Sequence, residues 1–256
     1  MIIEDLWLGV IGTQPAPPPA LVLATALLAA AMVGWRRSWR VLRLVVTIAH
    51  EGGHAVAAAL TGRRLLGVRL HSDTSGLTVS TGPATGPGMV FTLVAGYLAP
   101  SVLGLGGMLM LGTGHVTALL WVAVGLLGAM LLLIRNVYGV VAVVGTGSVL
   151  VVLSWFASPA VQGAFGYLFV WFLLFAAPRP VLEVRRLRRR GRGADSDPDQ
   201  LARLTGVGAS WWITLFAILT VGAATCAAYW LLPWDQSVAA LEWGVSPESY
   251  AHSVMS

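Results

Sequence analysis

The chain has 256 residues, of which 57% are hydrophobic and only 11% are charged. An average soluble domain is about 45–50% apolar and about 25% charged, so this chain has too few charged side chains to cover a water-facing surface. The composition excludes a disordered chain and an ordinary soluble enzyme. Because Cys226 is the only cysteine, an intrachain disulfide and a cysteine-based metal cluster are excluded as well. We therefore expect an all-α polytopic membrane protein that forms a single integral membrane domain over residues 1–256.

Seven segments are apolar over the length of about 20 residues that a membrane-spanning helix needs. In chain order they cover residues 19–35, 41–61, 89–111, 116–134, 137–156, 161–177 and 211–232. Gly96 and Pro100 lie inside the third segment. Because proline has no backbone N–H to donate, the sequence allows for a break of that helix between these two residues.

Two connections are too polar to lie in lipid. Residues 63–88 alternate apolar and polar side chains on both sides of a turn at 72–76, a pattern that predicts a β-hairpin. Residues 178–208 carry the arginine run Arg185–Arg192, followed by Asp195, Asp197 and Asp199. We expect the arginine run to contact anionic lipids, and we expect no nucleic-acid partner.

The arginines predict an orientation in the membrane. All 16 basic residues are arginine, and with seven spans four of them, between residues 36 and 43, lie on one side and twelve on the other. The positive-inside rule places the twelve in the cytoplasm. The N-terminus and both polar connections are then expected in the cytoplasm, and the C-terminus outside.

The second apolar segment contains His50-Glu51-Gly52-Gly53-His54. Residues four apart on a helix differ by about 400°, so the two imidazoles lie about 40° apart on one face. Glu51 follows His50 by about 100° and can lean toward the same site. Two neutral imidazoles at this spacing bind zinc, while the glutamate accepts a proton from a water molecule. The motif therefore predicts His50 and His54 as zinc ligands and Glu51 as the general base.

Two other interpretations of this motif stay open. The three side chains could form a buried polar network that packs helices together. They could also hold a metal that is structural or catalytically silent. Structural zinc sites usually have four protein ligands and are rich in cysteine, whereas ionisable groups inside a spanning helix are functional by default, so a catalytic site is favoured.

An HExxH motif in an early apolar segment, a polar hairpin directly after it and several further spans resemble the site-2 protease family of intramembrane zinc metallopeptidases. The stretch HEGGHAVAAALTG at residues 50–62, the sequence Gly76-Leu77-Thr78 and the stretch SDPDQLARLTG at residues 196–206 are most similar to the bacterial subgroup of site-2-protease-like membrane proteins. The resemblance covers roughly residues 41–235. It implies a protein of the bacterial plasma membrane that uses zinc to cleave a membrane protein or peptide within or next to the bilayer.

The third zinc ligand does not follow the usual pattern of that family, an aspartate before a glycine on a later span, because this sequence has no Asp-Gly pair. The candidates are Asp195, Asp197, Asp199, His71, Asp73, His115 and Asn136. His54 lies nine residues before Arg63, or about 13 Å from the cytoplasmic edge of the membrane, so a partner should approach from that side and His115 is disfavoured.

We choose Asp197 as the third ligand, with Asp199 and Asp195 as alternatives, because these aspartates lie on the cytoplasmic side and in the stretch that resembles the family. A second role for Asp197 is equally open. An aspartate followed by Pro198 is also typical of a helix start, in which Asp197 would only cap the helix.

The predicted function is that of an intramembrane zinc metalloprotease. The exposed edge of the hairpin could bind an extended substrate as an added strand. Asn136, in a tight turn between two spans, is a candidate for holding the substrate or its oxyanion. The alternative function, to which the missing Asp-Gly pair points, is an inactive metal-binding membrane scaffold that holds transmembrane clients. No related halves are visible, which argues against a transporter.

Overall fold

The structure is a computed structural model that describes residues 10–191 and 195–232. Most of these residues are helical. The helices are α2 (Pro19–Gly34), α3 (Arg36–Leu60), α4 (Pro87–Gly112), α5 (Val116–Leu133), α6 (Val137–Phe156), α7 (Pro159–Ala176), α8 (Pro178–Arg189), α9 (Asp197–Thr205) and α10 (Ala209–Leu231), and the strands are β1 (Arg64–Leu70) and β2 (Gly76–Thr81). Helices with one small hairpin are the expected architecture.

The structure does not confirm the seven expected membrane-spanning helices. Five helices are by themselves long and apolar enough to cross a bilayer: α4, α5, α6, the continuous pair α7 and α8, and α10. Helices α2 and α3 meet this criterion only as a pair bent by 100°. The physical reason is that α2 has only 16 residues and that α3 begins with four arginines in its first two turns. The described residues therefore give five or six spans.

One expectation about the helices is corrected, and one polar connection is largely helical. Helix α4 runs without a break through Pro100, so the third apolar segment is one continuous helix. The polar connection at residues 178–208 consists largely of the helices α8 and α9, because its apolar residues at Val181, Val184 and Leu201 are buried against the bundle. Arg192, the last residue of the arginine run, lies outside the described residues.

The hairpin forms as expected from its alternating pattern. Strands β1 and β2 are antiparallel, with Val68 opposite Thr78. Its turn is closed by Asp73, whose Oδ1 accepts a hydrogen bond of 2.9 Å from the backbone N–H of Ser75. The hairpin folds back along α3, because the hydroxyl of Thr47 donates a hydrogen bond of 2.7 Å to the carbonyl of Thr74 at the turn. The strands thus lie beside the middle of α3 and do not extend away from its end.

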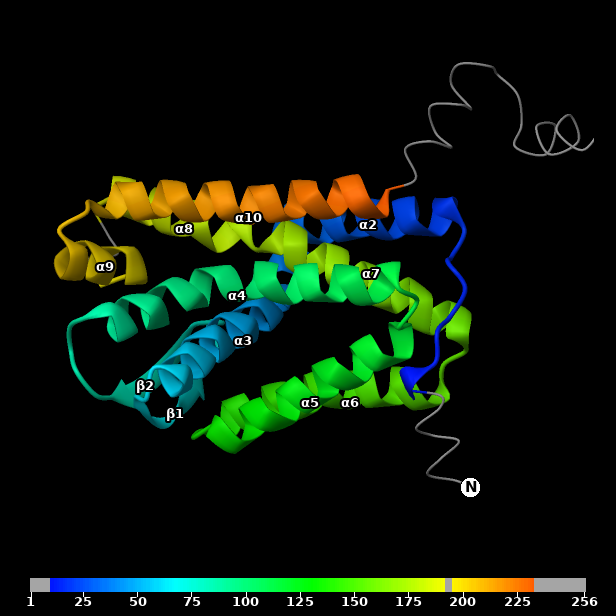
Figure 1. The fold of residues 1–256 in the computed structure, drawn as a ribbon, viewed down its shortest axis with the longest axis horizontal. Helices are drawn as coiled ribbons and strands as arrows, with labels where there is room; N and C mark the ends of the chain where they lie inside the picture. Colours follow the sequence, from blue (N-terminus) through cyan, green and yellow to red (C-terminus); the bar gives the residue numbers. More distant parts are fainter. Residues whose placement is uncertain (1–9, 192–194, 233–256) are drawn as a thin grey trace, which may run out of the picture.

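Two clusters of buried side chains fix the helices that carry the motif residues. The larger one joins α2, α3, α4 and α7 around Val170 and Trp171, both fully buried. The second cluster packs α9 against α4, α8 and α10 through Leu201 and Phe216, which are also fully buried. Figure 1 shows the hairpin and α9 at one end of the molecule, and the start of α2 and the end of α10 at the other. The second cluster therefore brings α9, late in the sequence, onto the early helices.

Candidate metal centre

Helix α3 presents the two histidines of the motif on one face. The rings of His50 and His54 meet edge to face with centroids 4.6 Å apart, and their Nε2 atoms are 3.0 Å apart. Both side chains are shielded from solvent, with 20% and 10% of their side-chain surface exposed. Spacing by one helical turn is sufficient for this arrangement, as the sequence predicts.

Helix α9 brings a carboxylate to the same point. Oδ2 of Asp197 lies 3.2 Å from Nε2 of His50 and 3.3 Å from Nε2 of His54. Asp197 is the first helical residue of α9, and Ser196 occupies the N-cap position in its place. The side chain of Asp197 is thus directed at the histidines, and the helix start and the histidine contacts occur together.

The three atoms have the spacing that a zinc ion requires. Ligand atoms at about 2.0–2.2 Å from a tetrahedral zinc are about 3.3 Å from one another. The observed separations of 3.0, 3.2 and 3.3 Å match one face of such a tetrahedron. In the part of the chain that the structure describes, His50, His54 and Asp197 are the group of side chains that could hold a metal ion.

Electrostatics at this point also favour a bound cation. Burial by itself raises the pKa of Asp197, but the hydrogen bonds from His50 and His54 outweigh that effect and hold the pKa below its usual range. The carboxylate is therefore ionised at neutral pH. An ionised oxygen and two imidazole nitrogens that converge on one point repel one another unless a proton or a cation lies between them.

The backbone of α4 sets the orientation of one imidazole. Nδ1 of His54 donates a hydrogen bond of 2.8 Å to the carbonyl oxygen of Thr92. A proton on Nδ1 leaves the lone pair of Nε2 free for a metal, an arrangement that is typical of histidine ligands. Thr92 is therefore a contributor to the site that the motif itself could not reveal.

Glu51 lies beside this group and does not belong to it. The residue is 5% exposed, and its side chain lies against β2, where the hydroxyl of Thr78 donates a hydrogen bond of 2.6 Å to Oε2. A Cβ atom at Gly76 would lie 2.6 Å from Oε1 of Glu51, so this close contact between strand and carboxylate requires glycine. The hairpin thus holds the carboxylate of Glu51 at the metal centre without making it a ligand.

Two glycines let α3 and α4 approach closely. A Cβ atom at Gly96 would lie 2.5 Å from Nε2 of His54 and 2.9 Å from Cε1 of His50. One at Gly53 would lie 2.5 Å from Cβ of Ala99. Gly96 is therefore the residue that leaves room for the imidazoles, although the sequence suggested it only as a weak point of the helix.

Tyr97, the neighbour of Gly96, forms the wall next to His50. Its ring contacts the His50 ring edge to face at a centroid distance of 4.9 Å and stacks on Phe216 at 5.0 Å. Phe216 belongs to α10, so this aromatic stack connects α10 to the metal centre. The apolar rings exclude water from one side of the site.

The other aspartates of the 195–199 stretch have different partners. The Oδ2 atom of Asp199 accepts a hydrogen bond of 2.5 Å from the hydroxyl of Ser196, and its Oδ1 atom forms an ion pair with Arg188. Asp195 is 95% exposed and lies 3.5 Å from Arg203. Neither carboxylate reaches the histidines in this structure.

The remaining candidates for the third ligand lie elsewhere. His71 and Asp73 belong to the hairpin turn, where both contact the hydroxyl of Ser75. His115 lies at the N-terminus of α5, near the opposite end of the molecule, with Nδ1 2.9 Å from the hydroxyl of Thr113.

Asn136 supports the hairpin. Its Nδ2 donates a hydrogen bond of 2.7 Å to the carbonyl of Leu70, and its Oδ1 accepts one of 3.2 Å from the N–H of the same residue. The adjacent backbone N–H of Arg135 bonds the carbonyl of Val68 at 2.9 Å. The α5–α6 turn therefore occupies the outer edge of β1, and both polar groups of the Asn136 amide are engaged there.

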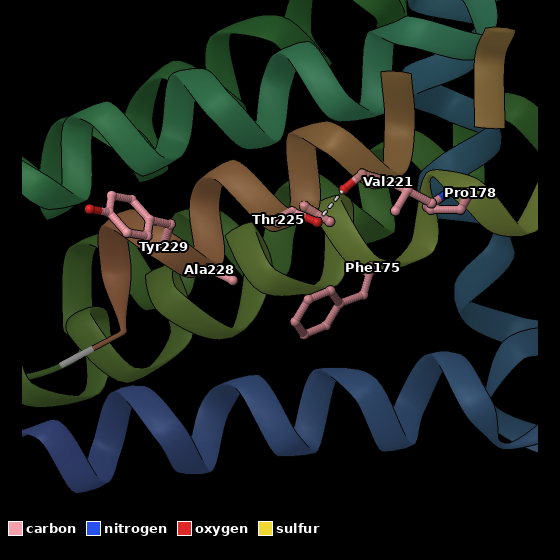
Figure 2. Close-up of a pocket in the computed structure, with 7 residues that line it drawn as sticks. Phe175, Pro178, Val221, Thr225, Ala228 and Tyr229 are labelled. Atoms are coloured by element: carbon pink, nitrogen blue, oxygen red, sulfur yellow. Dashed lines mark hydrogen bonds between the residues drawn. The ribbon is translucent and has the colours of Figure 1, made fainter. Parts of the chain in front are cut away.

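A hollow of about 440 Å³ lies between α7 and α10, apart from these polar groups. Figure 2 shows its lining, which includes Phe175, Val221 and Ala228. Its one dashed contact is the hydrogen bond from the hydroxyl of Thr225 to the carbonyl of Val221, which is internal to α10. The hollow is almost entirely apolar, so it brings no acid–base or metal-binding group to the chemistry described above.

A comparison with family models finds one match. The model for a family described as Peptidase M50B-like matches residues 23–227, the greater part of the chain, including α3, the hairpin and α9. No curated protein and no solved structure matches the chain.

Proposed function

The chain belongs to the Peptidase M50B-like family, and from this premise we propose that it is an intramembrane zinc metallopeptidase that hydrolyses peptide bonds of membrane-anchored or membrane-proximal polypeptides. The observation that carries the proposal is the convergence of His50, His54 and Asp197, at separations of 3.0–3.3 Å, beside the carboxylate of Glu51. Three protein ligands leave one tetrahedral position open, which distinguishes a catalytic zinc site from a closed structural one.

The roles of the residues follow from their places. His50, His54 and Asp197 would hold the zinc ion. When bound, zinc would lower the pKa of water and polarise a carbonyl group. Glu51 accepts the proton of the attacking water and passes it to the departing amine. Thr78 keeps the Glu51 side chain in place through its hydrogen bond of 2.6 Å. The rings of Tyr97 and Phe216 keep bulk water away from His50.

Strand β2 is the proposed binding edge for the substrate. The α5–α6 turn covers the outer edge of β1, and within residues 10–191 and 195–232 no strand pairs with the outer edge of β2. An extended peptide that adds to β2 would lie alongside Thr78 and therefore close to Glu51. Backbone pairing of this kind also fits a substrate helix that must unwind before cleavage.

The proposal is tested with purified protein and a panel of single-span substrates. Glu51→Gln removes the base and keeps the shape of the side chain, so cleavage is expected to fall by at least about a hundredfold. Glu248→Gln makes the same chemical change far from the motif in sequence and serves as the matched control. Cleavage by Glu51→Gln at the rate of the control would refute the mechanism.

The alternative function is an inactive metal-binding scaffold for transmembrane clients. It was suggested by the missing Asp-Gly pair, yet Asp197 supplies a carboxylate to the histidines from a different element. Stoichiometric zinc that is lost in His50→Ala and His54→Ala, together with no turnover of any client, would favour the scaffold over the peptidase.

We also propose that the end of the molecule with the hairpin and α9 faces the cytoplasm. The arginines of the hairpin, of the α5–α6 turn and of the α8 terminus lie at this end. If α2 and α3 cross the membrane once, as a bent pair, both described chain ends lie on the outer side. This differs from the cytoplasmic N-terminus expected with seven spans.

A thiol-labelling experiment tests this orientation. In a Cys226→Ala background, Ala16→Cys should react with a membrane-impermeant reagent on intact cells, and Ala84→Cys only after lysis. Both positions are exposed in the structure. Protection of Ala16→Cys in intact cells would instead support seven spans.

A further inference from the structure

A second polar site lies outside the metal centre, in a hollow of about 340 Å³ between α8 and α10. One wall consists of three arginines of α8, and the other of residues from the first two turns of α10. The lining residues are Arg185, Arg188, Arg189, Ser210, Ile213 and Thr214. Both sets follow helical spacing, i, i+3 and i+4, so the two helices turn matching faces toward the hollow.

The charge in this hollow is only partly balanced by nearby protein groups. Arg188 forms an ion pair with Asp199, whereas among the described residues no acidic side chain pairs with Arg185 or Arg189. Like charges one turn apart on a helix destabilise it. An anion that enters the hollow would relieve this repulsion, and the guanidinium groups of Arg185 and Arg189 with the hydroxyl of Ser210 provide several donors for phosphate oxygens.

The depth of the hollow fits the headgroup layer of a membrane. Trp211 and Trp212 follow Ser210 in the first turn of α10, and tryptophan is enriched at the membrane–water boundary. Trp211 is 53% exposed at this level. Apolar helix surface continues along α10 below the hollow, where acyl chains would lie.

We propose that this hollow binds the phosphate group of one anionic phospholipid. The ligand chemistry is a phosphate ester with a net negative charge, held by Arg185 and Arg189 from α8 and by the hydroxyl of Ser210 from α10, because the hydroxyl of Thr214 already donates to the carbonyl of Ser210. A free phosphate ion has the same oxygen atoms but lacks the acyl chains that α10 would cover. The site is therefore more specific than the general attraction between an arginine run and an acidic membrane.

The bound lipid also has a route to the metal centre. Arg188 lines the hollow and pairs with Asp199, two residues after Asp197 in the same helix. An anion that neutralises Arg185 and Arg189 allows Arg188 to keep its ion pair with Asp199. This ion pair stabilises the packing of α9 against α8. This part of the inference rests on the proposed function, because it assigns Asp197 to a zinc ion.

Lipid binding is tested on the full chain in neutral detergent by native mass spectrometry. The protein is titrated with short-chain phosphatidylglycerol, with phosphatidylcholine of the same chain length, or with inorganic phosphate. Saturable binding of one phosphatidylglycerol is expected, with weaker binding of the other two. Arg185→Gln with Arg189→Gln should lower the affinity for phosphatidylglycerol about tenfold or more, as the loss of charge-assisted contacts predicts.

The matched control is Arg186→Gln with Arg190→Gln, an equal loss of charge at the same sequence spacing but outside the hollow, with Arg186 in α8 and Arg190 as its C-cap. Its affinity should stay within about threefold of the unmodified chain, because the remaining attraction is diffuse. An equal loss in both double variants, or no preference for phosphatidylglycerol over phosphatidylcholine, would overturn the site. Phosphate that binds as tightly as phosphatidylglycerol would overturn the lipid as its ligand.

The route to the metal centre is tested separately by measuring zinc affinity with and without phosphatidylglycerol. The lipid should tighten zinc binding by about fivefold, a typical coupling between two sites, and this gain should vanish in Arg185→Gln with Arg189→Gln. Lipid binding without any change in zinc affinity would overturn the coupling. A chain that binds lipid but no zinc would instead refute the proposed function and leave the lipid site standing.

Discussion

Gly96 of α4 lies so close to His54 of α3 that a Cβ atom at this position would be 2.5 Å from Nε2 of the imidazole. Gly96→Ala should therefore displace both histidines, since the same atom would lie 2.9 Å from Cε1 of His50. We expect zinc affinity to fall about 10- to 100-fold, the range found when the support of a metal ligand is disturbed. Equilibrium titration with a competing chelator measures this affinity.

The control for this variant is Gly106→Ala in the same helix, where an added Cβ has no neighbour within 4 Å. Because alanine favours helices over glycine by about 1 kcal/mol, this control should bind zinc normally and be at least as stable as the unmodified chain. A Gly96→Ala protein with unchanged zinc affinity would show that the close contact between α3 and α4 is not needed to align the ligands.

The hydrogen bond between Thr78 and Glu51 separates positioning of the base from metal binding. Thr78→Val keeps the shape of the side chain and removes the donor to Oε2. A hydrogen bond to a charged group contributes about 1.5–3 kcal/mol, so kcat should fall about 10- to 100-fold. Zinc affinity should stay unchanged, because Thr78 does not contact the metal ligands.

Thr78→Ser retains the hydroxyl and should restore most of the lost kcat. A single-turnover assay with saturating substrate distinguishes this effect from weaker substrate binding, which would raise KM alone. If Thr78→Val cleaves as fast as the unmodified chain, the hairpin does not orient Glu51 during the reaction.

Local patterns in the sequence predicted those features that depend only on residues close together in the chain. The spacing of His50 and His54 requires only one helical turn, and the hairpin follows from alternation around a turn. The seven expected spans were not confirmed at residues 19–61, where hydropathy gives two apolar runs but the structure has a bend of 100° between α2 and α3. Tilt and bending of a helix depend on packing against other helices, which a pattern along the chain does not report.

The parts of the site that sequence patterns missed are contacts between distant elements. Thr92, Gly96 and Thr78 reach the motif residues only because α4 and β2 pack against α3. No local signal distinguishes Thr92 and Gly96 from other threonines and glycines of the chain, and the resemblance at residues 76–78 gave Thr78 no role. Asp197 was predicted because it lies in a stretch that resembles the family, whereas its ionised state depends on the hydrogen bonds from His50 and His54, which outweigh the effect of burial on its pKa.

The three aspartates of the 195–199 stretch should respond differently to replacement by asparagine. Asp197→Asn removes the ionised ligand oxygen and should lower zinc affinity by at least about a hundredfold, more than the loss of a supporting group does. Asp195→Asn should have no effect, because its side chain is 95% exposed. Both variants are compared with a competing chelator at the same pH.

For Asp199→Asn we expect a loss of zinc affinity between those of Asp197→Asn and Asp195→Asn. It breaks the ion pair with Arg188 and weakens the start of α9, so zinc affinity should fall about tenfold through the position of Asp197. A larger loss in Asp199→Asn than in Asp197→Asn would identify Asp199 as the ligand and reverse the assignment made from the structure.

The bonds between Asn136 and Leu70 predict that Asn136→Ala acts on stability. The variant leaves the N–H and the carbonyl of Leu70, a fully buried residue, without their partners at 3.2 and 2.7 Å. The free energy of unfolding should fall by about 1–3 kcal/mol, and the Tm with it. At a temperature where the variant is fully folded, kcat should stay within about threefold of the unmodified chain.

An oxyanion donor would behave in the opposite way, because its loss lowers kcat about 100- to 1000-fold with little change in Tm. That outcome would show that Asn136 takes part in the reaction and does not only support β1.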